Sequence, residues 1–255
     1  MLPTDQYEHK IQMVLSDIDI KAIKIGMLFD NDNTKAVVRS IEEYYSSSSS
    51  PRPPIICDPV CISTSGHPLL HPEALDTLIN DLFPLAMMIT PNKSEAEMLL
   101  SKRGLTTSIN TLEEMISAAS RMISTFSPHT VLLKGGHMYV TMQDVQHLLE
   151  IKQGVQVIKH GLMEENMEIL FAGEKSETET QLVVDVLQER GGTTTLFVRP
   201  RINSTKTHGT GCTLSAATAC ALAQGSTRTS FSCDPSLQKK WCVKETGLPS
   251  SDRCC

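Results

Sequence analysis

The stretch THGTGCTLSAA, residues 207–217, joins a glycine-containing turn to an alanine- and leucine-rich segment that ends near Gly225. We predict that this segment is a helix. The first N–H groups of a helix lack intrahelical partners and lie at the positive end of its dipole. Such an end binds phosphate or stabilises a developing oxyanion. Cys212 falls in the first turn, where the dipole favours a thiolate. The pattern therefore indicates phosphoryl transfer, although a plain helix cap is the common alternative for so short a motif.

Outward from this turn, strand-like and helix-like segments alternate along most of the chain. Short apolar runs separated by amphipathic segments are typical of an α/β fold with a parallel sheet covered by helices. We predict helices at residues 5–18, 31–45, 72–82, 93–101 and 112–126, and strands at 22–28, 55–57, 86–90, 130–134, 182–187 and 194–198.

Residues 1–225 are predicted to form one domain. Within it, the Ser- and Pro-rich residues 46–54 are expected to form an exposed loop. Residues 140–190 have a looser, charged pattern, which we interpret as strands interrupted by a solvent-facing insertion. After Gly225 no apolar face can be drawn, so residues 226–255, which contain four cysteines, are predicted to be a poorly ordered tail outside the core.

Composition limits the classes of function. A formal charge of −6 with scattered basic residues argues against a nucleic-acid-binding surface. No apolar run is long enough to span a membrane and no signal peptide is recognisable, so we expect a soluble protein of the cytosol. The cysteines lack zinc-ligand spacing, and Cys57 and Cys220 are interpreted as buried thiols. The sequence leaves open whether the chain forms a homo-oligomer.

Three further polar motifs follow predicted strands: DPV at 58–60, TPN at 90–92 and KGGH at 134–137. The ligand of a parallel α/β sheet lies beyond the carboxyl ends of its strands. We therefore expect these motifs to gather with the turn at 209–212 in one composite site.

Each motif also has a structural interpretation. Asp58 could hold Mg²⁺ through water, or could stabilise an Asx-type turn. Asn92 and Glu95 have the spacing of a helix capping box, which does not exclude a metal-binding role. Lys134 could neutralise nucleotide phosphates, or could be an ordinary lysine at a strand end. Met27 could be a core residue.

Taken together, the motifs resemble those of the hydroxymethylpyrimidine/phosphomethylpyrimidine kinases of thiamine biosynthesis, which belong to the ribokinase-like superfamily. The resemblance covers roughly residues 18–225 and rests on KIGML at 24–28, DPV at 58–60, STSG at 63–66, TPN at 90–92 with Glu95, LLKGGH at 132–137 and THGTGC at 207–212. It implies a three-layer αβα sandwich with a mostly parallel central sheet.

The resemblance also implies a reaction and a set of roles. ATP would phosphorylate the hydroxymethyl group of 4-amino-5-hydroxymethyl-2-methylpyrimidine and then its monophosphate, with Mg²⁺ as the metal. Cys212 would be the base, and the backbone at Gly209, Thr210 and Gly211 would stabilise the transferred group. The remaining roles fall to Asp58, Asn92 and Glu95 for Mg²⁺, to Lys134, Thr207 and His208 for the nucleotide, and to Met27 and Val60 for the pyrimidine.

The sequence departs from the family pattern at both ends. It starts after the first strand and Gly-rich loop of the family and lacks the closing helices, so we expect a truncated chain that binds the pyrimidine poorly. A pyridoxine or pyridoxal kinase on the same fold is the nearest alternative. A catalytically inactive interaction or regulatory protein is an alternative from a different class.

Overall fold

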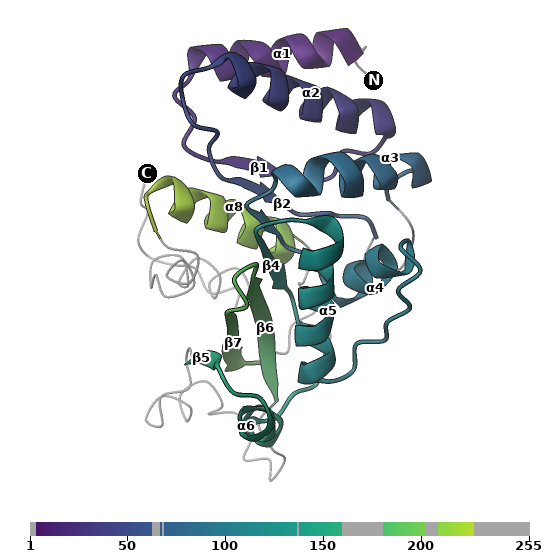
Figure 1. Cartoon of the computed structure of the whole chain (residues 1–255), viewed down its shortest axis with the longest axis vertical. Helices are drawn as coiled ribbons and strands as arrows, with labels where there is room; N and C mark the ends of the chain where they lie inside the picture. The colour runs from purple at the N-terminus through teal and green to yellow at the C-terminus, as the bar shows by residue number, and fades with distance from the viewer. Residues whose placement is uncertain are drawn as a thin grey trace, which may run out of the picture.

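In the computed structural model, a seven-stranded sheet forms the centre of the molecule, with the strand order β1-β2-β3-β4-β6-β7-β5 (Figure 1). The structure describes residues 4–62, 67, 69–136, 138–159, 181–201 and 209–226. The strands are β1 (Ile23–Ile25), β2 (Ile55–Cys57), β3 (Met88–Ile89), β4 (Thr130–Leu133), β5 (Val155–Lys159), β6 (Leu182–Glu189) and β7 (Thr194–Pro200). Strands β1 to β4 pair in parallel, as do β5 and β7, whereas β6 is antiparallel to both its neighbours. The carboxyl ends of all strands except β6 therefore lie at one edge.

Helices lie on both faces of this sheet (Figure 1). The larger core cluster joins one face to helices α2 (Asn31–Ser47), α3 (Pro72–Thr77), α4 (Lys93–Ser101) and α5 (Leu112–Phe126). A smaller cluster joins Leu132 and Phe197 on the other face to α8 (Thr210–Ala223). Helix α1 (Thr4–Asp17) packs on α2, and α6 (Met142–Ile151) packs on α5. This is the expected α/β sandwich of three layers.

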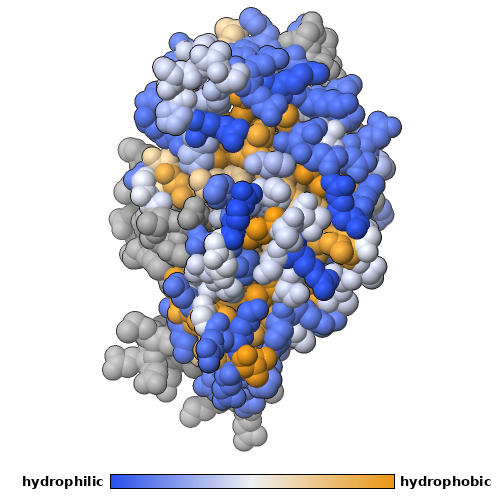
Figure 2. Space-filling model, viewed as in Figure 1, coloured by the Kyte–Doolittle hydropathy of each residue, from blue (hydrophilic) through white to orange (hydrophobic). Residues whose placement is uncertain are grey.

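Helix α5 illustrates why the larger face is well packed. Its N-cap Thr111 and Glu114 form a reciprocal capping box, which fixes the first turn. Its apolar residues recur three or four positions apart, so that they share one face, and those that are buried include Leu112, Met115, Ile116, Ala119 and Met122. The outward faces of these helices are largely hydrophilic, and hydrophobic residues are visible mainly in the seams between them (Figure 2).

The predicted elements are confirmed in kind, with differences at their ends. The bounds of α4, α5 and β2 agree with the sequence prediction, whereas β1 and β3 are shorter than predicted. Residues 46 and 47 extend α2, because the Ser47 hydroxyl donates to the Glu43 carbonyl and continues the helical pattern. The predicted helix at 72–82 changes after Thr77 into a π-turn at Leu78–Leu82 and then a 3₁₀ turn at Phe83–Leu85.

The structure differs most from the prediction between residues 140 and 190. Helix α6 was not predicted, yet Val145 and Leu148 bury it against the core, and β5 joins the sheet edge. Residues 160–180 of that stretch, and residues 227–255 of the predicted tail, lie outside the described residues. Among the residues that are described, no helix is both long enough and apolar enough to cross a membrane.

The burial of the cysteines was predicted correctly only in part. Cys57 is completely buried in the larger core, as predicted, but Cys220 is exposed on α8. The prediction for Cys220 was wrong because small apolar and small polar residues are mixed around α8, so the sequence does not indicate which side of the helix packs.

Candidate active site

The parallel ladder continues beyond strands β2, β3 and β4: Asp58 and Thr90 follow β2 and β3 directly, and Lys134 after β4 pairs with Asn92 in a parallel bridge. The Asp58 amide donates to the Ile25 carbonyl, the Thr90 amide to the Cys57 carbonyl, and the Lys134 amide to the Pro91 carbonyl, at 2.9, 3.0 and 2.9 Å. Because side chains alternate along a strand, Asp58 and Lys134 lie on the sheet face that carries α8, opposite to their neighbours Cys57 and Leu133.

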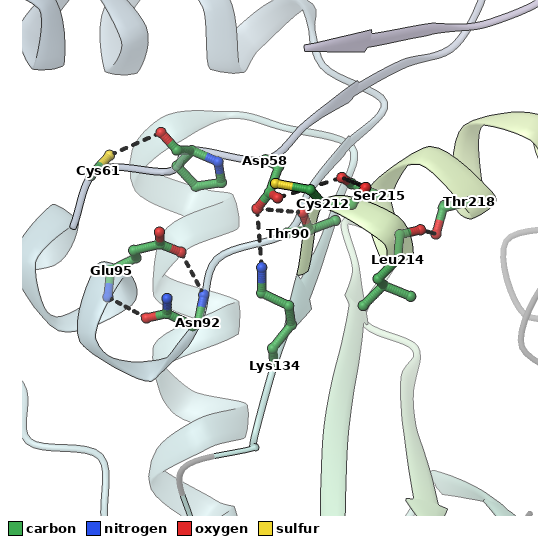
Figure 3. Close-up of polar contacts among 11 residues, drawn as sticks. Asp58, Cys61, Thr90, Asn92, Glu95, Lys134, Cys212, Leu214, Ser215 and Thr218 are labelled. Atoms are coloured by element: carbon green, nitrogen blue, oxygen red, sulfur yellow. Dashed lines mark hydrogen bonds and ion pairs between the residues drawn. The ribbon is translucent and has the colours of Figure 1, made fainter. Parts of the chain in front are cut away.

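Asp58 is the centre of the polar contacts at this edge (Figure 3). Its carboxylate is 2% exposed and accepts from Lys134 Nζ at 3.0 Å and from Thr90 Oγ1 at 3.2 Å, both on Oδ1. Ser215 Oγ lies 3.4 Å from Oδ2 and also 3.0 Å from the Cys212 carbonyl oxygen. A buried carboxylate is costly unless it is paired, and the Lys134 ammonium supplies its charge partner.

The turn before α8 lies against this pair. Gly209 caps the helix at a φ of 82°, which favours glycine, and no side chain caps the helix at this position. A Cβ atom at Gly211 would lie 2.9 Å from Lys134 Nζ and 3.8 Å from Asp58 Oδ2, so the backbone there approaches both charges. Cys212 follows with an exposed thiol, and Figure 3 places it beside Asp58 and Ser215. The structure therefore brings Gly211, Cys212, Asp58 and Lys134 together, as expected.

Asn92 and Glu95 form the capping box at the start of α4. The Asn92 side chain accepts from the Glu95 amide at 2.9 Å, and the Asn92 amide donates to Glu95 Oε2 at 2.8 Å. The Glu95 carboxyl also accepts a backbone hydrogen bond from Cys61. It thus connects α4 to the loop after β2. Burial raises the pKa of Glu95 above its ordinary value, although the Lys134 charge and these hydrogen bonds oppose the shift.

Met27 and Val60, the predicted pyrimidine contacts, follow β1 and β2 at the same edge. The Met27 side chain is 52% exposed, which contradicts the alternative that it is a core residue. Val60 is half-buried and has a φ of 38°, which is unusual for a β-branched residue and marks a strained position. Thr207, His208, His137 and the segment at 63–66 lie outside the described residues.

Sequence analysis did not identify Ser215 as a site residue. It is completely buried and is the group of α8 that contacts Asp58, although 157 positions separate the two in the chain. Its one sequence signal is its position three residues after Cys212, which places both on the same side of a helix.

The buried thiols of β2 and of the loop after it should differ in reactivity from those of α8. Burial raises the pKa of Cys57 and of Cys61, whereas Cys212 and Cys220 are exposed. With iodoacetamide at neutral pH, we expect Cys57 and Cys61 to react at least about 100-fold more slowly than Cys220, because they require local unfolding. Peptide mass spectrometry over time measures this ratio, and equal rates for Cys61 and Cys220 would contradict the described packing.

Stability should depend on pH through Glu95. An acid whose native pKa is raised stabilises the fold at low pH, and this contribution is lost as the pH rises from about 4.5 through the native pKa. We expect Glu95→Gln to remove this dependence, at about 1.4 kcal/mol for each pH unit inside that window. Urea unfolding of both proteins at a series of pH values tests it. A difference between the two curves that changes with pH in this window supports the raised pKa of Glu95. A difference that is constant at every pH would reflect only the altered hydrogen bonds and would disprove the raised pKa.

The family model described as phosphomethylpyrimidine kinase matches residues 1–168 and 141–230. A hydroxymethylpyrimidine/phosphomethylpyrimidine kinase of Rhizobium meliloti is 30% identical over 216 residues, which are 85% of this chain and 61% of that protein. The Salmonella typhimurium protein of the same name is 31% identical over 210 residues, 82% of this chain and 59% of its own length. This chain thus spans about three fifths of these relatives.

Solved structures with the same fold include two kinds of kinase. A phosphomethylpyrimidine kinase from Clostridium difficile has a TM-score of 0.60 at 24% identity, covering 97% of this chain and 75% of that one. The ADP complex of Bacillus subtilis pyridoxal kinase has a TM-score of 0.65 at 24% identity, covering 98% and 73%. A Staphylococcus aureus pyridoxal kinase in complex with AMP-PCP reaches 0.59 at 25% identity, covering 90% and 64%. At 24% identity, the first two likenesses show a shared fold and no more.

Proposed function

Because this chain belongs to the phosphomethylpyrimidine kinase family, we propose that it catalyses two phosphoryl transfers from ATP. The first acceptor is the hydroxymethyl group of 4-amino-5-hydroxymethyl-2-methylpyrimidine, and the second is the resulting monophosphate. The names of its relatives support this substrate, and the ADP and AMP-PCP complexes of the structural neighbours support the nucleotide. We place the reaction in the cytosol, within thiamine biosynthesis.

The observation that carries this proposal is the approach of the Gly211 backbone to the Asp58–Lys134 ion pair, beside an exposed cysteine. Phosphoryl transfer needs little covalent chemistry from a protein, but it needs positioning and stabilisation of charge on the transferred group. A helix N-terminus and a lysine ammonium supply that stabilisation at one place.

Within this proposal each group has a defined task. The Cys212 thiolate takes the proton of the acceptor hydroxyl, the oxygen attacks the γ-phosphorus, and ADP leaves with the electron pair of the broken P–O bond. The backbone N–H groups of Gly209, Thr210 and Gly211 donate hydrogen bonds to the oxygens of the transferred phosphoryl group and stabilise their negative charge. Lys134, with Thr207 and His208, binds the nucleotide phosphates, while Met27 and Val60 contact the pyrimidine ring.

The described residues fit Mg²⁺ through its water shell rather than directly. No group of three His, Cys, Asp or Glu residues in the described part of the chain could hold a metal. The Glu95 and Asn92 side chains already accept backbone hydrogen bonds in the capping box. Mg²⁺ commonly keeps several waters, so Asp58, Asn92 and Glu95 would accept from these waters. The bound ion would neutralise charge on the ATP phosphates.

A pyridoxal kinase activity is the second candidate, because pyridoxal kinases share the fold at TM-scores of 0.59 to 0.65. An assay of the purified chain with Mg²⁺ and ATP decides between the two. Each acceptor is supplied separately, ADP release is followed with a coupled enzyme, and phosphorylated products are identified by mass spectrometry. We expect two successive products from the pyrimidine. Preference for pyridoxal would establish the pyridoxal kinase alternative. If neither acceptor causes ADP release, the chain is instead a catalytically inactive interaction or regulatory protein.

A further inference from the structure

The glycine after Lys134 lies directly against strand β6. A Cβ atom at Gly135 would be 1.9 Å from the Val184 carbonyl oxygen, which is a backbone atom and cannot turn aside. The β4–β6 register pairs Leu133 with Val186, so one step further Lys134 lies opposite Asp185. The chain therefore leaves β4 in close contact with β6, and only glycine fits at position 135.

The Asp185 side chain stabilises this contact between residue 135 and β6. Its Oδ1 accepts from the Gly135 amide at 2.9 Å, and its Oδ2 pairs with Arg199 Nη2 at 2.7 Å. The Asp185 side chain is almost completely buried, so it needs both the hydrogen bond and the positive partner. Both oxygens of this carboxylate are thus held, one by the backbone that follows Lys134 and the other by β7.

Lys134 is consequently fixed on both sides. Its own amide donates to the Pro91 carbonyl of the β3 loop, and the next amide donates to Asp185. The side chain then extends to Asp58 and to the Gly211 backbone. The Arg199 guanidinium neutralises Asp185, which lies opposite Lys134 in the register and would otherwise compete with Asp58 for the ammonium.

We propose that Asp185, held by Arg199, is a positioning residue that sets the place of Lys134 for nucleotide phosphates. This inference rests on the proposed function, because it assumes that Lys134 binds a nucleotide. Asp185 itself acts through the Gly135 backbone. Displacement of a charged group by a fraction of an ångström weakens binding disproportionately, since charge-assisted contacts depend steeply on geometry.

The test compares Asp185→Ala, Asp185→Asn and Val186→Ala with the wild-type chain. Asparagine keeps an oxygen that can accept from the Gly135 amide, whereas alanine leaves that amide unpaired. Val186 is buried on the same strand but on the opposite face, so Val186→Ala controls for lost stability. Titration calorimetry measures the Kd for AMP-PCP with Mg²⁺, and thermal melting measures stability.

We expect Asp185→Ala to raise this Kd about tenfold and Asp185→Asn about threefold, with Val186→Ala within about twofold of wild type. Equal affinities for Asp185→Ala and Val186→Ala would overturn the inference, whatever their melting temperatures. The amide exchange rate of Gly135, measured by NMR relative to that of Leu132, is read in parallel and should rise about tenfold only in Asp185→Ala.

The two readouts separate this inference from the proposed function. If the wild-type chain binds no AMP-PCP, the proposed function fails and the role of Asp185 toward a nucleotide fails with it. If the wild-type chain binds AMP-PCP but the Gly135 amide exchanges equally in all variants, only the positioning role is disproved.

Discussion

Replacement of Cys212 by alanine is expected to lower kcat by about 10²- to 10⁴-fold, the range typical for loss of a general base. The Kd for AMP-PCP should stay within about twofold, because the backbone amides at 209–211 and the Lys134 ammonium remain in place. Steady-state kinetics with the pyrimidine and calorimetry with AMP-PCP measure the two quantities.

Cys220→Ala is the matched control for this prediction, since Cys220 is an exposed thiol of the same helix, eight positions further on. It should leave kcat unchanged. Cys212→Asp restores a base at the same place and should retain more turnover than Cys212→Ala. If Cys212→Ala keeps full turnover, the thiol is not the proton acceptor.

The largest effect on stability is expected for Gly135→Ala. The added methyl group would meet the Val184 carbonyl oxygen at 1.9 Å, so β4 and β6 would have to separate locally. We expect the free energy of unfolding to fall by about 3 kcal/mol, the upper end of the usual cost of overpacking. Denaturant unfolding measures this, with a check that the transition is two-state.

Gly136→Ala is the natural control, because nothing lies within 4 Å of a Cβ atom at that neighbouring position. It should change the free energy of unfolding by no more than about 0.5 kcal/mol. Similar losses in both variants would mean that glycine is needed here for backbone freedom and not for the close approach of β6.

Local signals made much of the fold predictable. Helices α4 and α5 were bounded correctly because Asn92 and Thr111 cap them, each with a glutamate three residues on. Helix α6 has the same device in Thr141, but with Asp144 in place of the glutamate, and it buries only two side chains. It is also only ten residues long, shorter than the window of about 11–18 residues over which helical periodicity is read, so periodicity alone did not indicate it.

The site was predictable where its residues follow strands or begin a helix, and unpredictable where they lie in the middle of a regular element. Asp58 and Lys134 stand at strand ends, which parallel topology brings to one edge. Ser215 lies inside a helix and Asp185 inside a strand, and their contacts join residues 157 and 50 positions apart. Such partners depend on the packing of the whole sheet, which no local pattern encodes.

The left-handed backbone at Val60 implies a compromise between durability and binding. A β-branched residue at a φ of 38° costs on the order of 1–3 kcal/mol, and the rest of the molecule must compensate for it. A glycine at this position would relax the loop, but it would also remove the Val60 side chain, which we propose contacts the pyrimidine. Under that proposal, the strain at residue 60 is a cost in stability that binding of the ligand requires.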